Sequence, residues 1–224
     1  MSEVIITVRG EHETRIAPEE GVARVTVKAE GPQRGTVVER IAALVLPLRD
    51  DLSAREEQGT IVDWSSQRTA VWANRPWNND GKQLALVHYA TVEITATFTD
   101  FAALSWWVSD VAEREGVQVD GVTWRLTPGT AKQTEADVAT QAVRVAVDRA
   151  TAYAGAIGLT AITPLEIADL GLLTHGAPDG GGAPAPKMLR AMAMGVMDGS
   201  APAVQFQPED IVVTAAVEAR FMAR

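Results

Sequence analysis

The feature that most constrains the fold is a long stretch of alanine and valine between two β-like segments. From about Ala131 to Ile157, small apolar residues recur at intervals of three and four, the spacing that puts them on one face of an α-helix. The recurring residues are Ala139, Ala142, Val143, Ala146, Val147, Ala150, Ala154 and Ile157. Because these side chains are small, the predicted helix can approach its neighbour closely.

The residues before this helix alternate between strand and helix patterns. Strands are predicted over 21–30, 60–73, 84–98 and 117–127, and helices from about 34 and over 101–116. This order is that of the ferredoxin-like split βαβ arrangement. We therefore predict an α+β fold, an antiparallel sheet packed by helices. Its core covers about 21–127, and the long helix and two C-terminal strands, over 162–173 and 211–221, extend it.

Two further expectations concern the beginning of the chain and its overall organisation. Residues 4–8 predict a short strand, and Glu11-His-Glu13 with Pro18 predict a turn before the next one. We expect residues 1–224 to form a single domain. Within it, residues 176–203 hold six Gly and four Pro, which predicts a flexible excursion.

Four methionines fall inside this excursion. Met188, Met192, Met194 and Met197 lie within ten residues, and methionine is adaptable enough to serve on varied binding surfaces. We expect them to form an interaction segment that docks on its own domain or on a neighbouring subunit.

Composition and charge exclude several classes of protein. The net charge of −9 argues against a nucleic-acid partner, since phosphate binding needs a basic face. There are no cysteines, so disulfides and thiolate metal sites are excluded. No apolar run has the length of a transmembrane helix, and the first residues lack the pattern of a signal peptide. As written, the sequence predicts a cytoplasmic protein.

The sequence carries no catalytic signature. Its histidines at 12, 88 and 175 have no partner at metal-ligand spacing, and no serine sits in a nucleophile motif. We expect no metal, no cofactor and no enzymatic activity. His12 is expected in a solvated turn. His88 lies on the apolar face of its predicted strand, and we expect it to be a hydrogen-bonded histidine of the core or of a groove.

The tryptophans offer candidate binding residues. Trp64 and Trp72 share the same parity in their predicted strand, and Trp77 follows in the connection to the next strand. With His88, these three define a possible groove for a small molecule. The adjacent Trp106 and Trp107 must diverge by about 100° on a helix, so at least one of the six tryptophans should be partly exposed. Exposed aromatic residues are enriched at protein interfaces.

Several segments resemble the SIMPL domain family (DUF541), whose relatives include periplasmic and outer-membrane immunogenic proteins. They include Ile5-Thr-Val-Arg-Gly10, Val22-Ala-Arg-Val-Thr-Val27 and Tyr89-Ala-Thr-Val-Glu-Ile94. The most specific is Thr140-Gln-Ala-Val-Arg-Val-Ala-Val-Asp-Arg-Ala-Thr-Ala-Tyr-Ala154 with Gly158, which is similar to the family's alanine-rich helix and its glycine-marked end. The resemblance covers roughly residues 3–222.

The resemblance implies an α+β domain of bacterial origin that carries no catalytic residues. Some relatives assemble into large ring- or channel-like oligomers, some are associated with stress responses, and many are exported. Our leading hypothesis is therefore a non-enzymatic protein that acts by self-association, as a homo-oligomer, or by binding a protein partner. The alternative is a small-molecule-binding protein or enzyme with a groove near His88 and the hairpin tryptophans.

Overall fold

The computed structural model describes residues 3–77, 84–173 and 205–224, and these residues form two compact units. The central unit holds residues 18–77, 84–125 and 205–208. The terminal unit holds 3–17, 126–173 and 209–224, and so combines both ends of the chain. Each unit has its own sheet and its own hydrophobic core. Within the described residues, no helix combines the length and the hydropathy that crossing a membrane requires.

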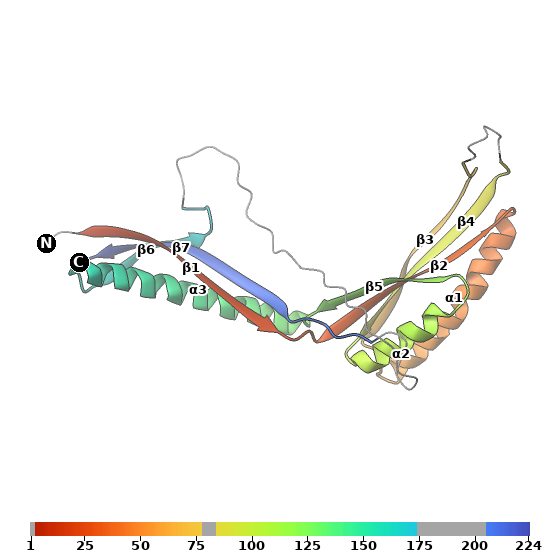
Figure 1. Cartoon of the computed structure of the whole chain (residues 1–224), viewed down its shortest axis with the longest axis horizontal. Coiled ribbons are helices and arrows are strands. Elements are labelled where there is room, and N and C mark those ends of the chain that lie inside the picture. The colour runs from red at the N-terminus through yellow and green to blue at the C-terminus, as the bar shows by residue number, and fades with distance from the viewer. Residues whose placement is uncertain (1–2, 78–83, 174–204) are drawn as a thin grey trace. The chain divides into compact units, whose positions relative to one another are not determined.

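The central unit has the predicted ferredoxin-like order. Its elements are β2 (Glu20–Gly31), α1 (Arg34–Glu57), β3 (Asp63–Asn74), β4 (Val87–Phe98), α2 (Phe101–Ala112) and β5 (Val117–Arg125). The strands form an antiparallel sheet in the order β3-β4-β2-β5. Both helices lie on one face of this sheet (Figure 1). The α+β fold class and the split βαβ core are therefore confirmed.

Strict alternation along the strands explains why the helices cover only one face. Every second residue of β4 from Ala90 to Phe98 is buried, and Ala23, Val25 and Val27 of β2 are fully buried beside them. Asp100 begins α2 as its N-cap, because its side chain accepts hydrogen bonds from the backbone N–H groups of the first helical turn. The helices then bring Leu, Val, Ile and Trp side chains onto the strands' apolar face.

A buried ion pair joins β2 to β5 at one end of this sheet. The Glu20 side chain is 6% exposed, and its Oε2 accepts a hydrogen bond from Nε of Arg125 at 2.6 Å. Burial of a carboxylate is tolerated here because the guanidinium compensates its charge.

We expect Arg125→Met to destabilise the protein by about 2 kcal/mol, because it leaves the Glu20 carboxylate buried without its cation. The value lies below that for a fully buried pair because Arg125 itself is 46% exposed. Urea denaturation followed by circular dichroism measures this change. The double variant Glu20→Gln, Arg125→Met should recover part of the loss. A double variant as unstable as the single one would show that the charge is not the cause.

The terminal unit is built on the predicted long helix. It contains β1 (Val4–Ile16), α3 (Pro128–Ala156), β6 (Ile162–Asp169) and β7 (Ile211–Ala223). The strands form an antiparallel sheet in the order β1-β7-β6, and α3 packs along β1 and β7 (Figure 1). Thr127 caps the start of α3, and Gly158, with φ of 79°, follows its end.

Two expectations for this part of the chain were wrong. The turn predicted at 11–13 does not form, because β1 continues through it and pairs with β7 along its whole length. The two C-terminal strands do not extend the ferredoxin-like sheet: β7 pairs with β1 on one side and β6 on the other. The pattern of a strand shows which of its faces is buried but carries no information about its pairing partner.

Candidate functional site

The β3–β4 hairpin contains the binding residues predicted from the sequence, but a β-bulge changes their arrangement. Trp64 of β3 lies opposite Ala96, whereas Trp72 lies opposite Tyr89, because the register shifts between Ser66 and Arg68. An extra residue in a strand moves every following side chain to the other face. The prediction that Trp64 and Trp72 share a face was therefore wrong.

The four predicted binding residues consequently fall in three places. Trp64 lies half-buried against the core, with the Arg49 guanidinium 6.0 Å from its ring centre. His88 is half-buried on the helix-covered face and pairs with Ala73 of β3. Trp72 lies on the opposite face, and Trp77 lies past the end of β3. The structure thus brings Trp72, Trp77 and His88 to the hairpin's outer end, but His88 lies on the face opposite to Trp72.

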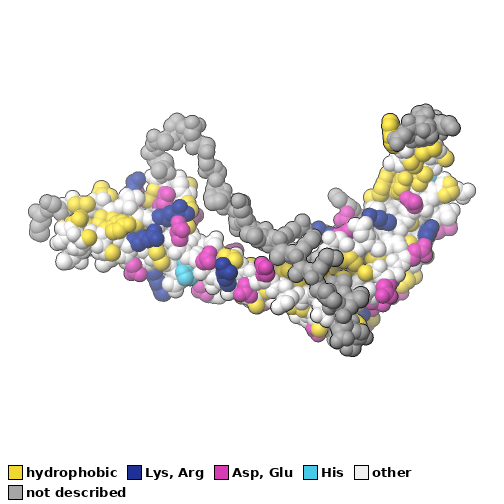
Figure 2. Space-filling model, viewed as in Figure 1, with side chains coloured by type: hydrophobic (Ala, Val, Ile, Leu, Met, Phe, Trp, Pro, Cys, Tyr) yellow, Lys and Arg dark blue, Asp and Glu magenta, His cyan; other side chains and the backbone are white. Residues whose placement is uncertain are grey.

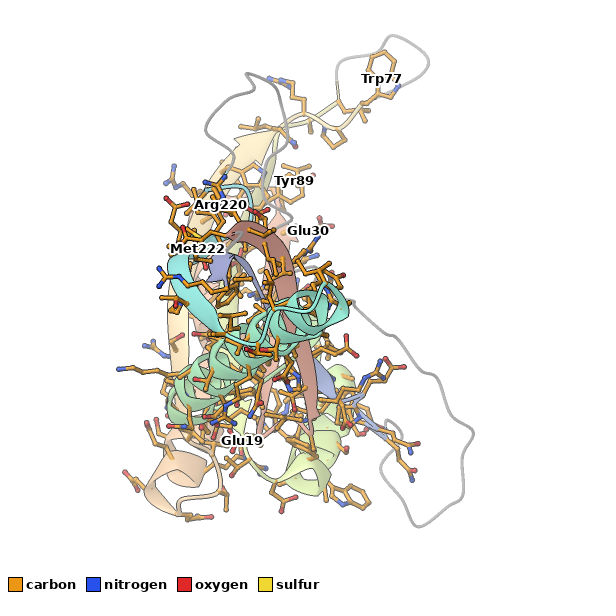
Figure 3. All side chains as sticks on the ribbon, turned by 90° about the vertical axis from the view of Figure 1, so that its left-hand side faces the viewer. Glu19, Glu30, Trp77, Tyr89, Arg220 and Met222 are labelled. Atoms are coloured by element: carbon orange, nitrogen blue, oxygen red, sulfur yellow. The ribbon has the colours of Figure 1, made fainter. Side chains whose placement is uncertain are left out.

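This outer end exposes a group of apolar side chains, which we call the hairpin end. The exposed fractions are 43% for Trp72, 86% for Trp77, 38% for Leu84 and 42% for Leu86. Hydrophobic side chains gather at this end in Figure 2, at the upper right of the view. Trp77 lies at its tip, beyond Tyr89 (Figure 3). Large exposed apolar groups in one place mark an interaction surface more often than scattered single residues do.

A ring stack and a hydrogen bond between described residues help to hold the hairpin end in shape. The rings of Trp72 and Tyr89 stack at 5.5 Å between centres, with 16° between their planes. At the base of the connection, Nη1 of Arg75 donates a hydrogen bond to the backbone oxygen of Leu84 at 2.7 Å. Among residues 69–77 and 84–91, Arg75 carries the only formal charge. The hairpin end is therefore apolar and weakly cationic in a chain whose net charge is −9.

A second exposed apolar surface lies on α1, and we call it the α1 stripe. Val38, Ala42 and Leu46 follow one another at four-residue intervals, and Val38 and Leu46 are 43% and 59% exposed. Beside them lies a shallow depression of about 340 Å³ that Ala42, Ala43, Val45, Leu46 and Arg49 line. Small residues flanked by larger ones give a helix surface into which a bulky side chain can pack.

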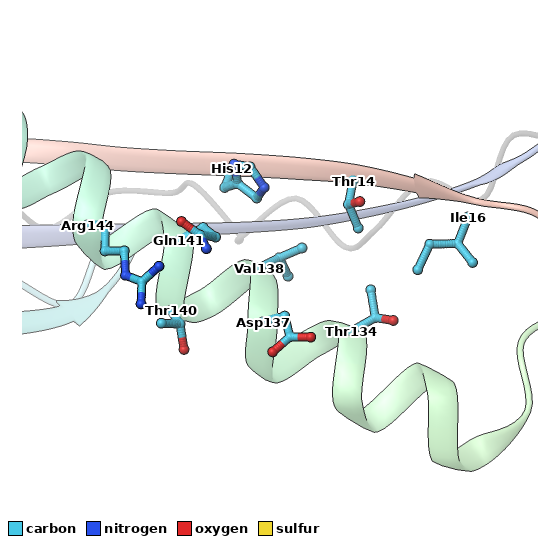
Figure 4. Close-up of a pocket in the computed structure, with 9 residues that line it drawn as sticks. All are labelled: His12, Thr14, Ile16, Thr134, Asp137, Val138, Thr140, Gln141 and Arg144. Atoms are coloured by element: carbon cyan, nitrogen blue, oxygen red, sulfur yellow. The ribbon is translucent and has the colours of Figure 1, made fainter.

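A third feature is a polar groove in the terminal unit, between β1 and α3 (Figure 4). Its volume is about 390 Å³. The groove is lined by His12, Thr14 and Ile16 of β1 and by Thr134, Asp137, Val138, Thr140, Gln141 and Arg144 of α3. The sequence did not predict this groove, since it needs the pairing of the first strand with the long helix.

The comparison with known families identifies the chain. The model of the SIMPL family, described as a protein of unknown function (DUF541), matches residues 6–221. The chain belongs to the SIMPL family. The resemblance seen in the sequence is thereby confirmed over nearly the whole chain. No curated protein matches it.

The SIMPL family description assigns no reaction, ligand or partner. The candidate functional residues of this SIMPL protein are therefore identified from the geometry of its structure. Sequence reasoning missed Leu84, Leu86 and Tyr89 at the hairpin end. The sequence does contain a sign of them: apolar residues occupy both odd and even positions of the strand next to the turn, so both of its faces are apolar there. The predicted interaction segment with Met188, Met192, Met194 and Met197, and the excursion over 176–203, lie outside the described residues and stay predictions.

Proposed function

We propose that this SIMPL protein acts without catalysis, by self-association in which the hairpin end of one copy binds the α1 stripe of another. The observation that carries the proposal is the exposure of two tryptophans and two leucines at the hairpin end. Tryptophan dominates binding energy at interfaces because it buries a large apolar area with few rotatable bonds. Trp77, at 86% exposure, has the most area to lose to a partner.

The α1 stripe is the reason for choosing a second copy as the partner. It is apolar and exposed, and its alanines leave room between Val38 and Leu46 for side chains of the hairpin end. The two surfaces differ, and we propose that they meet head-to-tail, each copy using its hairpin end on one neighbour and its α1 stripe on another. Such contacts form closed rings or open filaments according to the rotation between successive copies. This supports the homo-oligomer that the sequence led us to expect.

Replacing two apolar residues of the hairpin end should abolish the association. We expect Trp77→Ser with Leu86→Ser to weaken it at least a hundredfold, since removing a central aromatic anchor costs 2 kcal/mol or more and a second apolar loss adds to it. Size-exclusion chromatography with light scattering, over a range of concentrations, measures the oligomer.

The matched control is Trp106→Ser, which removes a tryptophan that is 55% exposed on α2, outside the hairpin. It should leave the assembly intact. A wild-type protein that stays monomeric at several hundred micromolar would refute the proposal. So would a Trp106→Ser variant that dissociates as completely as the hairpin double variant.

A further inference from the structure

The groove between β1 and α3 has a defined closed end. At Gly10, strand and helix touch: a Cβ at this position would lie 2.0 Å from the carbonyl oxygen of Ala142. Toward Ile16 and Thr134 the two elements separate, and the groove opens (Figure 4). The inward face of β1 changes at the same place, from the buried Ile6 and Val8 to His12 and Thr14. The space therefore begins where the lining becomes polar.

Hydrogen-bond donors gather near the closed end. Arg144, Gln141 and His12 line this part of the groove. Within the described parts of the chain, the Arg144 guanidinium makes no hydrogen bond or ion pair, and neither does the His12 ring. Asp148, one helical turn away, is placed to pair with Arg144 but does not.

The neighbouring carboxylates of β1 are already paired. Glu11 forms an ion pair with Arg9, and Glu13 forms one with Arg15 at 3.8 Å. These four residues alternate with His12 and Thr14, so they lie on the face of the sheet away from α3. The guanidinium of Arg144 thus has no carboxylate to neutralise it from the strand side.

One carboxylate does line the groove, at the other end. Asp137 lies seven residues before Arg144, about 10 Å along the helix, and accepts a hydrogen bond from Nε2 of Gln133 at 3.0 Å. Thr140 lies between the two, and its hydroxyl donates to the backbone oxygen of Ala136. Thr14 lies beyond Asp137, toward the open end (Figure 4). This part of the groove suits hydroxyl groups, which can donate to Asp137 and to the threonine oxygens.

We infer that the groove binds a small hydroxylated organic anion. Its carboxylate or phosphate group contacts Arg144 and Gln141, with the His12 ring beside it, and its hydroxyl groups point toward Thr14 and Asp137. Arginine is suited to this task because its fork of N–H donors matches the oxygens of a carboxylate or phosphate. This site lies in the terminal unit and is independent of the proposed self-association, which uses only the central unit.

The test is a titration followed by nuclear magnetic resonance of the histidine rings and arginine side chains. Citrate serves as the carboxylate probe and glycerol 3-phosphate as the phosphate probe, so that the two sources are distinguished. Binding of either should shift the His12 and Arg144 signals and leave His88, in the central unit, unchanged. Arg144→Gln should weaken binding at least tenfold, as expected for loss of a charged hydrogen bond.

The matched control is Lys132→Gln, which removes one positive charge from the same helix outside the groove. It should change the affinity less than twofold. Both replaced side chains are exposed, so the variants should fold and melt as the wild type does. Absence of any shift with either probe would overturn the inference. Equal weakening by Arg144→Gln and Lys132→Gln would also overturn it, because general electrostatics would then explain the binding.

Discussion

Gly10→Ala should destabilise the terminal unit by about 3 kcal/mol or more, although it adds a single methyl group. The added Cβ would lie 2.0 Å from the carbonyl oxygen of Ala142 and 2.7 Å from the backbone nitrogen of Ala146. Both atoms belong to the α3 backbone, so no side-chain rotation relieves the overlap. Strand and helix must move apart, which opens gaps along their whole contact. Overpacking of a core costs 1–3 kcal/mol even where side chains can adjust.

The remainder of this contact shows why the cost is high. Every fourth residue of α3 is buried against the sheet, and four of the six are alanine. The buried residues are Thr134, Val138, Ala142, Ala146, Ala150 and Ala154. Small side chains put the helix at close range, where many atoms contact across the interface at once. Moving strand and helix apart at Gly10 therefore also weakens the packing contacts of the neighbouring alanines.

Hydrogen exchange followed by mass spectrometry locates the effect of Gly10→Ala. Amides of β1, α3 and β7 should exchange faster, since this strand–helix contact protects them. The matched control is Gly129→Ala, which lies in the first turn of α3 with open space around its Cβ position. That variant should be neutral or slightly more stable. Equal stability of Gly10→Ala and wild type would refute the close contact.

Trp107→Ala should cost the central unit about 4 kcal/mol, the usual range for removing a buried tryptophan. Trp107 is 1% exposed, and its ring centre lies 5.5 Å from that of Phe98. Its Nε1 donates to Oδ2 of Asp51 at 3.0 Å, and Asp51 is also paired with Arg55. The substitution leaves a cavity between helix and sheet and takes one donor from a carboxylate that is only partly exposed.

Urea denaturation monitored by fluorescence measures this change, because all six tryptophans lie in the central unit. Trp107→Phe tests the hydrogen bond: it removes the Nε1 donor but keeps most of the apolar contact, for a loss of about 1–2 kcal/mol. The neighbouring Trp106→Ala provides the surface control, with a change within about 0.5 kcal/mol. Similar losses for Trp106→Ala and Trp107→Ala would contradict the assignment of Trp107 to the core.

The adjacent tryptophans illustrate what local sequence predicts well. Helical geometry required Trp106 and Trp107 to point in different directions, and the structure buries one and exposes the other. Local periodicity also predicted the ferredoxin-like order of elements and the long helix. In each case the signal repeats over ten or more residues, so that one irregular position does not remove it.

The failures come from features that periodicity does not contain. The bulge after Ser66 is a single extra residue, yet it moves Trp72 away from the face that holds Trp64. The pairing of β1 with β7 joins residues about two hundred positions apart, and alternation in either strand is equally compatible with other partners. The polar groove depends on the packing of β1 against α3 and on their close contact at Gly10, so the sequence alone gave no sign of it.

The central claim is that the hairpin end of one copy binds the α1 stripe of the next, and mixing two complementary variants tests it most directly. One variant carries Trp77→Ser with Leu86→Ser. The other carries Leu46→Glu, which places a charge in the α1 stripe. Each alone lacks one of the two surfaces and should sediment as a monomer. Their equimolar mixture retains one intact pair of surfaces, so analytical ultracentrifugation should show a one-to-one dimer that does not grow further. A mixture that remains monomeric, beside a wild type that assembles, would contradict the account.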